Sequence, residues 1–196
     1  MQNLVIAPER PVGERVETPF RYDRATIRLH WASAILIACL WGIAQIIDFF
    51  PNGPLRVDVR STHITLGILL MLVLVLRLTW RGSGRGSAAP PAAGPLEQAA
   101  TVGHWLLYAL IILAVASGIA NAWIRGESIF NLFTIPSFSP GDRDMRRLIG
   151  TIHSYATNGL VIVALGHAAM ALLHHYILRD EMLGRMLPNA RRMRTR

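Results

Sequence analysis

Four long apolar runs constrain this 196-residue chain more than any other feature of its sequence. They predict membrane spans at about residues 27–48, 61–80, 100–124 and 148–178. A helix needs about 20 mainly apolar residues to cross a bilayer. The hydrogen bonds within the helix pair its backbone N–H and C=O groups inside the lipid. Only 16% of the residues are charged, against roughly 25% in soluble proteins. We therefore predict an all-α integral membrane four-helix bundle.

The segments outside the spans are polar or rich in Gly and Pro. The bundle is expected to occupy residues 26–180, with a polar tail at 1–25 and a basic tail at 181–196. The connections are predicted as a short loop at 50–60, a flexible linker at 81–97 and a long loop at 125–147.

Arginine supplies all 20 basic residues, and the net charge is +8. Such a charge would suit a nucleic-acid partner, so the positions of the arginines decide its meaning. Fourteen of them lie in the two tails, just before the first span or after the second, and six lie in the other two connections. Basic residues accumulate on the cytoplasmic side of a membrane. We therefore predict cytoplasmic N- and C-termini, contact with membrane lipid and no nucleic-acid partner.

All seven histidines lie in the apolar runs or at their edges, where ionisable residues are costly and usually functional. They are His30, His63, His104, His153, His167, His174 and His175. The predicted topology places His63 and His153 at an outer level. It places His167 at an inner level, with either His30 or His104 as its partner. His153 and His167 are 14 residues apart, which puts them on one helix face and about 21 Å apart along the axis.

Two imidazoles that face each other across a bundle are the ligands of six-coordinate haem iron. The sequence therefore predicts two non-covalent, bis-histidine b-type haems stacked across the membrane. The single Cys39 excludes the two-thiol attachment of a c-type haem. Alternatives remain open for each histidine: an interhelical hydrogen bond, an interfacial position or a metal such as zinc. Small residues that leave room for a ring, or that pack helices closely, are Gly42, Gly67, Gly118, Gly150, Gly159 and Gly166.

Two further residues lie on nearly the same helix face as a histidine of their own span. Arg77 follows His63 by 14 residues, so it is expected to face the inner haem and pair with its propionates. Its alternative role is a topology arginine that extends to the interface. His174 follows His167 by seven residues, which places it below the inner haem, where a quinone headgroup could bind. The alternative for His174 and His175 is a solvated interfacial side chain.

The order and spacing of the histidines resemble the bacterial cytochrome b561 family, in particular its small diheme four-helix members that act as superoxide oxidases. The resemblance covers about residues 24–188. The matching segments are Ile27-Arg28-Leu29-His30-Trp31, Thr62-His63-Ile64-Thr65-Leu66-Gly67, Gly103-His104-Trp105, Ile152-His153-Ser154-Tyr155-Ala156-Thr157-Asn158 and the run from Leu165-Gly166-His167 to His174-His175-Tyr176.

The resemblance implies that His30 and His167 hold one haem, and that His63 and His153 hold the other. His104 is then left for a propionate, for a contact to a ligand or for the quinone pocket. The resemblance also implies a bacterial inner-membrane protein that oxidises superoxide at the outer haem and reduces ubiquinone near the inner one.

Basic residues before the fourth span could attract the superoxide anion. The candidates are Arg143, Arg146 and Arg147, with Arg56, Arg60 and Arg125 as weaker ones. The alternative is a solvated face beside Asp142 and Asp144.

Three functions follow from these residues. The first is a superoxide:ubiquinone oxidoreductase. The second is a haem-carrying conduit for a partner, such as a dehydrogenase, a hydrogenase or a periplasmic cytochrome. The third is a non-redox membrane protein whose histidines bind metal or pack the bundle. We take the first as the working prediction and the second as its main alternative.

Overall fold

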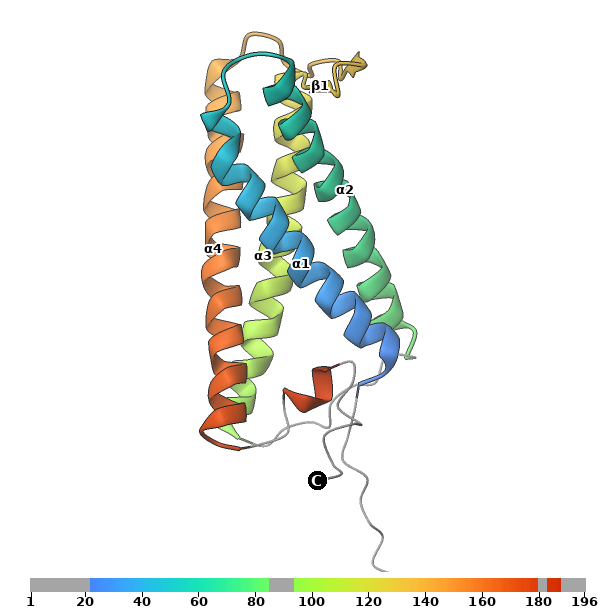
Figure 1. Cartoon of the computed structure of the whole chain (residues 1–196), viewed down its shortest axis with the longest axis vertical. Helices are drawn as coiled ribbons and strands as arrows, with labels where there is room; N and C mark the ends of the chain where they lie inside the picture. The colour runs from blue at the N-terminus through green and yellow to red at the C-terminus, as the bar shows by residue number, and fades with distance from the viewer. Residues whose placement is uncertain (1–21, 85–93, 180–182, 188–196) are drawn as a thin grey trace, which may run out of the picture.

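Four long helices dominate the computed structural model, which describes residues 22–84, 94–179 and 183–187 (Figure 1). The helices are α1 (Arg24–Ile46), α2 (Pro54–Gly82), α3 (Pro95–Arg125) and α4 (Arg143–Tyr176). Two short 3-10 helices and a two-stranded hairpin complete the described elements: η1 (Ile47–Phe49), β1 (Ser128–Ile129), β2 (Phe133–Thr134) and η2 (Gly184–Met186). All four long helices are long and apolar enough to cross a membrane. The predicted all-α membrane four-helix bundle is confirmed.

The helices begin three to seven residues before the predicted spans. Their first turns are polar, so hydropathy does not mark them. The Asp23 carboxylate accepts the Thr26 N–H at 2.9 Å, and the Asp142 carboxylate accepts the Met145 N–H at 2.9 Å. Pro54 occupies the start of α2, where its missing N–H costs nothing. Residues 54–60, expected in a loop, are therefore helical. Most of both predicted tails and linker residues 85–93 lie outside the described residues.

The bundle consists of two close helix pairs. α3 packs along α4, and α1 packs along α2, whereas α1 contacts α4 much less. The buried centre contains aliphatic side chains and one tyrosine from all four helices: Leu36, Leu40, Leu70, Leu74, Tyr108, Ile111 and Leu160. Leu36 and Leu40 are four residues apart on α1, and Leu70 and Leu74 are four residues apart on α2. Each pair lies on one helix face, so both of its members reach the core.

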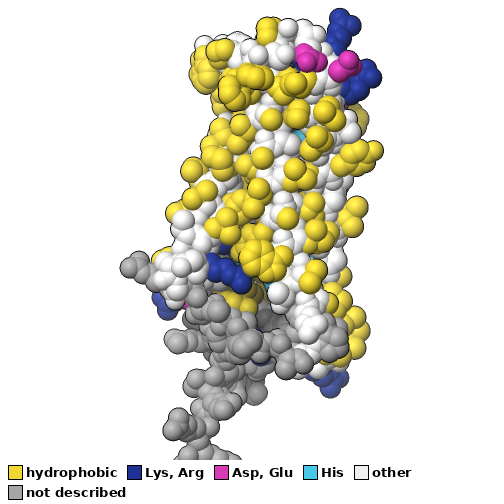
Figure 2. Space-filling model, turned by 180° about the vertical axis from the view of Figure 1, so that it is seen from behind, with side chains coloured by type: hydrophobic (Ala, Val, Ile, Leu, Met, Phe, Trp, Pro, Cys, Tyr) yellow, Lys and Arg dark blue, Asp and Glu magenta, His cyan; other side chains and the backbone are white. Residues whose placement is uncertain are grey.

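The two ends of the bundle differ. The hairpin end carries the β1–β2 hairpin, and the opposite tail end is where α1 begins and α4 finishes (Figure 1). At the tail end, η2 lies beneath α1, and the Trp31 indole donates a hydrogen bond to the Met186 carbonyl at 2.9 Å. On the face seen in Figure 2, apolar side chains cover the helices between the two ends, and basic side chains lie toward both ends. This surface is the one a multi-pass membrane protein presents to lipid.

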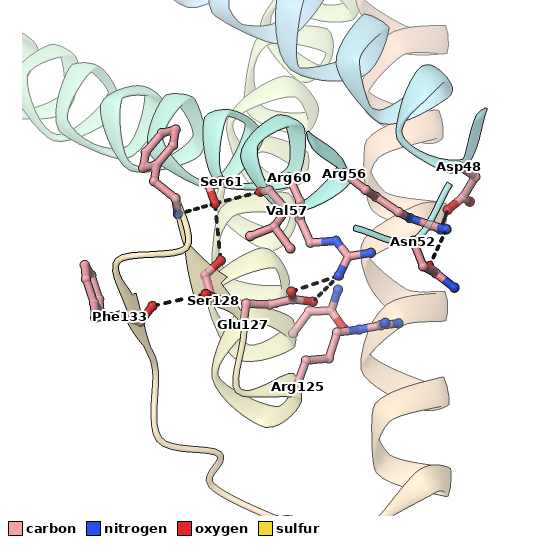
Figure 3. A network of polar contacts seen from close by, with 12 residues as sticks. Asp48, Asn52, Arg56, Val57, Arg60, Ser61, Arg125, Glu127, Ser128 and Phe133 are labelled. Atoms are coloured by element: carbon pink, nitrogen blue, oxygen red, sulfur yellow. Dashed lines mark hydrogen bonds and ion pairs between the residues drawn. The ribbon is translucent and has the colours of Figure 1, made fainter. Parts of the chain in front are cut away.

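The hairpin between α3 and α4 is tied to α2 by polar contacts (Figure 3). The Ser61 hydroxyl is fully buried and accepts the Phe130 N–H at 2.8 Å. Arg60 donates to both carboxylate oxygens of Glu127, at 2.9 and 3.2 Å. The Asn131 amide donates to the Asp58 carboxylate at 2.8 Å. These contacts fix the part of α2 that lies directly before His63.

Candidate functional site

His63 of α2 and His153 of α4 meet near the hairpin end. Their ring centroids are 6.3 Å apart, and the ring planes are nearly perpendicular at 85°. His153 Nδ1 lies 3.0 Å from the Ala114 carbonyl and 3.3 Å from the Ser117 hydroxyl, both on α3. A proton on Nδ1 is donated to that carbonyl, which leaves Nε2 as the free ligand nitrogen.

His63 is supported differently. Its Nδ1 is buried and has no hydrogen-bond partner among the residues that the structure describes. The backbone of Leu40 on α1 lies within interaction distance of the same ring, so the ring is held between α1 and α4.

Three histidines cluster nearer the tail end. The ring centroids of His30 (α1) and His167 (α4) are 6.4 Å apart, at an interplanar angle of 62°. His104 (α3) lies closer to His167, at 5.1 Å and 71°. The His104 Nδ1 is 2.7 Å from the Ala100 carbonyl one turn earlier on its own helix. One imidazole thus faces His167 across the bundle, and another stands beside it.

These separations can be compared with the geometry of a shared metal. With metal–nitrogen bonds of about 2 Å, two imidazoles on opposite sides of one metal have ring centroids about 6.3 Å apart. The 6.3 Å of His63 with His153 and the 6.4 Å of His30 with His167 leave room for one metal ion, and they also lie within the range of edge-on ring contacts. The 5.1 Å between His104 and His167 is shorter than either.

The glycines near these rings are of three kinds. A Cβ added at Gly42, Gly67 or Gly166 would meet no heavy atom within 4 Å in the described part of the chain. A Cβ at Gly118 would lie 3.0 Å from His153 Cε1, so this glycine admits the imidazole against α3. Gly150 and Gly159 have ordinary contacts of 3.6 and 3.8 Å, to Arg125 and Leu110. The sequence could not separate these three groups.

Arg77 faces the interior of the bundle at the level of the tail-end histidines. Its Nη2 lies 3.4 Å from His30 Nδ1, and its guanidinium carbon lies 5.1 Å from the centroid of the Tyr108 ring. Tyr108 is buried, so the guanidinium is held over an aromatic face rather than extended to the interface.

A pocket of about 490 Å³ opens at the hairpin end beside the first pair. Its lining includes His153 and three arginines, Arg125, Arg146 and Arg147, which we call the pocket arginines. Arg125 is oriented by the Asn121 side chain, which accepts its Nε–H at 2.9 Å. Arg143, predicted to act with Arg146 and Arg147, is exposed at the start of α4 and does not line this pocket.

The fold and the histidine arrangement can be compared with known proteins. The model of the prokaryotic cytochrome b561 family matches residues 21–189, most of the chain. The chain belongs to the prokaryotic cytochrome b561 family. It is accordingly a membrane haem protein of a family that binds b-type haem.

Curated relatives of the b561 family align with most of the chain. "Cytochrome b561 homolog 1" of Escherichia coli strain K12 is 31% identical over 86% of this chain and 97% of its own length. "Probable superoxide oxidase CybB" of Yersinia pestis is 29% identical over 87% of this chain and 98% of its own length. "Cytochrome b562" of Cereibacter sphaeroides is 26% identical over 85% of this chain and 94% of its own length.

Sequence reasoning missed several residues of this b561 bundle. Ser117 and the Ala114 carbonyl hold His153 from α3, and the only available signal was a small Ser-Gly pair within an apolar run. Tyr108 beneath Arg77 had no signal, because an aromatic residue in a span usually packs in a core or against lipid. Arg125 was not missed, because the sequence offered it as a weaker candidate; its place in the pocket depends on how the end of α3 lies against α4.

His174 and His175 occupy the last turn of α4 at the tail end. His174 is half-buried, whereas His175 is exposed and packs edge-on against Tyr176, with ring centroids 4.8 Å apart. His174 lies about 10 Å farther along the axis than His167, by the helix rise.

Proposed function

We propose that this b561 protein is a diheme electron carrier that oxidises superoxide at the hairpin end and reduces ubiquinone at the tail end. The observation that carries the proposal is the pair of cross-bundle imidazole separations, 6.3 and 6.4 Å, at two levels of one bundle. A bound b haem supplies an iron that is reversibly reduced by one electron. Two such groups would let electrons cross a layer that ions do not enter.

The proposed ligands are His63 with His153, and His30 with His167. For the second haem, the separation of 6.4 Å favours His30, and the shorter 5.1 Å disfavours His104. The Ala114 carbonyl supports the His153 assignment because it binds Nδ1 and leaves Nε2 for the metal. His104 is then assigned a place beside the inner haem, or in the quinone pocket.

Arg77 follows from the His30 assignment. An imidazole that binds iron through Nε2 carries its proton on Nδ1, so that nitrogen cannot accept a hydrogen bond from a guanidinium. The 3.4 Å contact between Arg77 and His30 Nδ1 must then give way, and Arg77 needs another acceptor. We assign it a haem propionate, which a guanidinium binds in a charge-assisted pair.

The direction of transfer rests on charge. In the sequence, fourteen of the 20 arginines belong to the two tails, the start of the first span and the end of the second with its linker, which favours a cytoplasmic tail end and a periplasmic hairpin end in a bacterial inner membrane. The pocket arginines then face the side from which superoxide arrives. Their field raises the local concentration of a small anion next to His153.

The proposed reaction balances in electrons and protons. Two superoxide anions each lose one electron to give two molecules of oxygen. One ubiquinone takes up those two electrons and two protons to give ubiquinol. The protons are required only at the quinone, and His174 is the candidate group that binds its headgroup or passes a proton there.

The test uses the detergent-purified full chain. The proposal predicts two b haems per chain, reduction by superoxide that added superoxide dismutase abolishes, and reoxidation by ubiquinone. Two haems that only dithionite or a co-purified protein reduces would favour the alternative, a conduit for a partner dehydrogenase, hydrogenase or periplasmic cytochrome. A chain without haem after expression with adequate haem supply would overturn both.

A further inference from the structure

A second cavity, of about 450 Å³, lies at the tail end between α1 and α2. Arg24 and Arg28 of α1 and Trp80 of α2 form its polar rim, and Leu29 and Leu76 line it with aliphatic carbon. None of the histidines of the two proposed haem sites lines it. The cavity is therefore separate from the redox site and needs its own account.

The two arginines of this cavity are exposed and have no partner among the described residues. Arg24 and Arg28 are one helical turn apart, so their side chains share a face and repel each other. Neither forms a hydrogen bond or an ion pair with any residue that the structure describes. At the hairpin end, by contrast, Arg56 pairs with Asp48 and Arg60 with Glu127. Two adjacent unpaired guanidinium groups favour a shared anionic ligand.

The neighbouring carboxylate does not supply that anion. Asp23 accepts the Thr26 N–H at 2.9 Å and the Thr26 hydroxyl at 2.6 Å, and thereby caps α1. The same carboxylate accepts the Trp80 indole N–H at 3.1 Å. These bonds join the start of α1 to the end of α2, and they hold the walls of the cavity together.

The position of the cavity indicates where its ligand comes from. Trp80 lies near the end of a predicted membrane span, at the depth where indole rings prefer the headgroup region. The leucines face a cavity between two membrane-spanning helices, where an acyl chain or glycerol backbone can pack. Basic pockets between such helices on the cytoplasmic side suit the headgroups of anionic lipids.

We propose that this cavity binds the phosphodiester headgroup of an anionic phospholipid, such as phosphatidylglycerol or cardiolipin. Arg24 and Arg28 donate to the phosphate oxygens, and the aliphatic wall contacts the lipid backbone. The bound lipid stabilises the α1–α2 contact. His30 follows Arg28 by two residues and Arg77 precedes Trp80 by three, so this contact also fixes the tail-end site.

The test uses delipidated full-length protein with its haem retained. Lipid binding is measured by native mass spectrometry and by the melting temperature, with phosphatidylglycerol or phosphatidylcholine added to the micelle. Wild type should prefer phosphatidylglycerol. The double variant Arg24→Gln/Arg28→Gln should lose about tenfold or more of that preference. The single variant Arg81→Gln removes one positive charge at the same end outside the cavity and should keep the preference.

A second variant covers the case in which charge removal disturbs insertion. Arg24→Lys/Arg28→Lys keeps the charge but loses bidentate binding, so the preference should fall partway. Equal binding of the two lipids by wild type would overturn the proposal, as would a glutamine double variant that matches Arg81→Gln. Soluble glycerophosphate that binds as tightly as the lipid would assign the site to a free phosphate compound and would also overturn it.

Discussion

Replacing Gly118 with alanine tests whether α3 positions the His153 ring for a metal. The new Cβ would lie 3.0 Å from His153 Cε1 and 3.4 Å from Nδ1. Carbon atoms pack at about 3.5–4.0 Å, so the ring must move by about 0.5 Å or the helices must separate. Metal–ligand distances tolerate about 0.2 Å. The substitution therefore disturbs the bond to a hairpin-end haem more than it disturbs the fold.

A matched control separates the overpacking cost of Gly118→Ala from the effect of alanine on helix propensity. Gly103 lies on the same helix, and a Cβ added there meets no heavy atom of the described residues within 4 Å. Both alanines gain up to about 1 kcal/mol of helix propensity. Only Gly118→Ala also incurs the overpacking cost of about 1–3 kcal/mol. Gly103→Ala should therefore be the more stable of the two variants by that difference.

The assay is haem retention and the midpoint potential of each haem in purified protein. We expect Gly118→Ala to weaken haem binding at the hairpin end by about 10–100-fold, as other losses of ligand support do, while the tail-end haem keeps its wild-type spectrum. Gly103→Ala should retain the hairpin-end haem. A Gly118→Ala protein with both haems bound at wild-type affinity and potential would refute the reasoning.

Three further outcomes are expected. His63→Ala should lose the hairpin-end haem and keep the other, counted by haem-to-protein ratio; loss of both from a folded protein would contradict independent sites. Changing the pocket arginines together to glutamine should slow reduction by superoxide and flatten its dependence on ionic strength, measured by stopped-flow; an unchanged salt response would exclude steering. Ser61→Ala should lower the free energy of unfolding by about 1 kcal/mol or more, because the part-buried Phe130 N–H loses its acceptor. The exposed Thr62→Ala serves as its control, and equal effects in denaturant titration would argue against the hairpin anchor.

The four helices and the meeting of His63 with His153 could be predicted because hydropathy marks each span and the order of the spans puts these two histidines at the same level. The 14-residue interval from His153 to His167 returns to nearly the same face of one helix, which gave the second level. The early starts of the helices were underestimated because hydropathy ignores polar first turns, even where Asp23 or Asp142 caps them.

The choice between His30 and His104 could not be made from spacing. It depends on how α1 and α3 are rotated about their own axes, which side-chain packing across the bundle determines. The hairpin was equally hidden, because its turn places Phe130 and Asn131 at positive φ without a glycine to mark it. The contacts of Ser61 with that turn join residues almost 70 positions apart, beyond any local pattern.

The apolar layer between the two histidine levels gives the proposed reaction its physical logic. The buried side chains there are leucines, an isoleucine and Tyr108, with no carboxylate or imidazole in the cluster. Tyr108 is the one ionisable side chain of this cluster, so in the proposed reaction the protons for quinone reduction would enter from the tail end. Each transferred electron then crosses the membrane without a compensating proton. Moving that charge toward a negative cytoplasm costs about 2.3 kcal/mol per 100 mV of membrane potential. Superoxide oxidation at the hairpin end, which needs no proton, must supply this driving force together with that for quinone reduction.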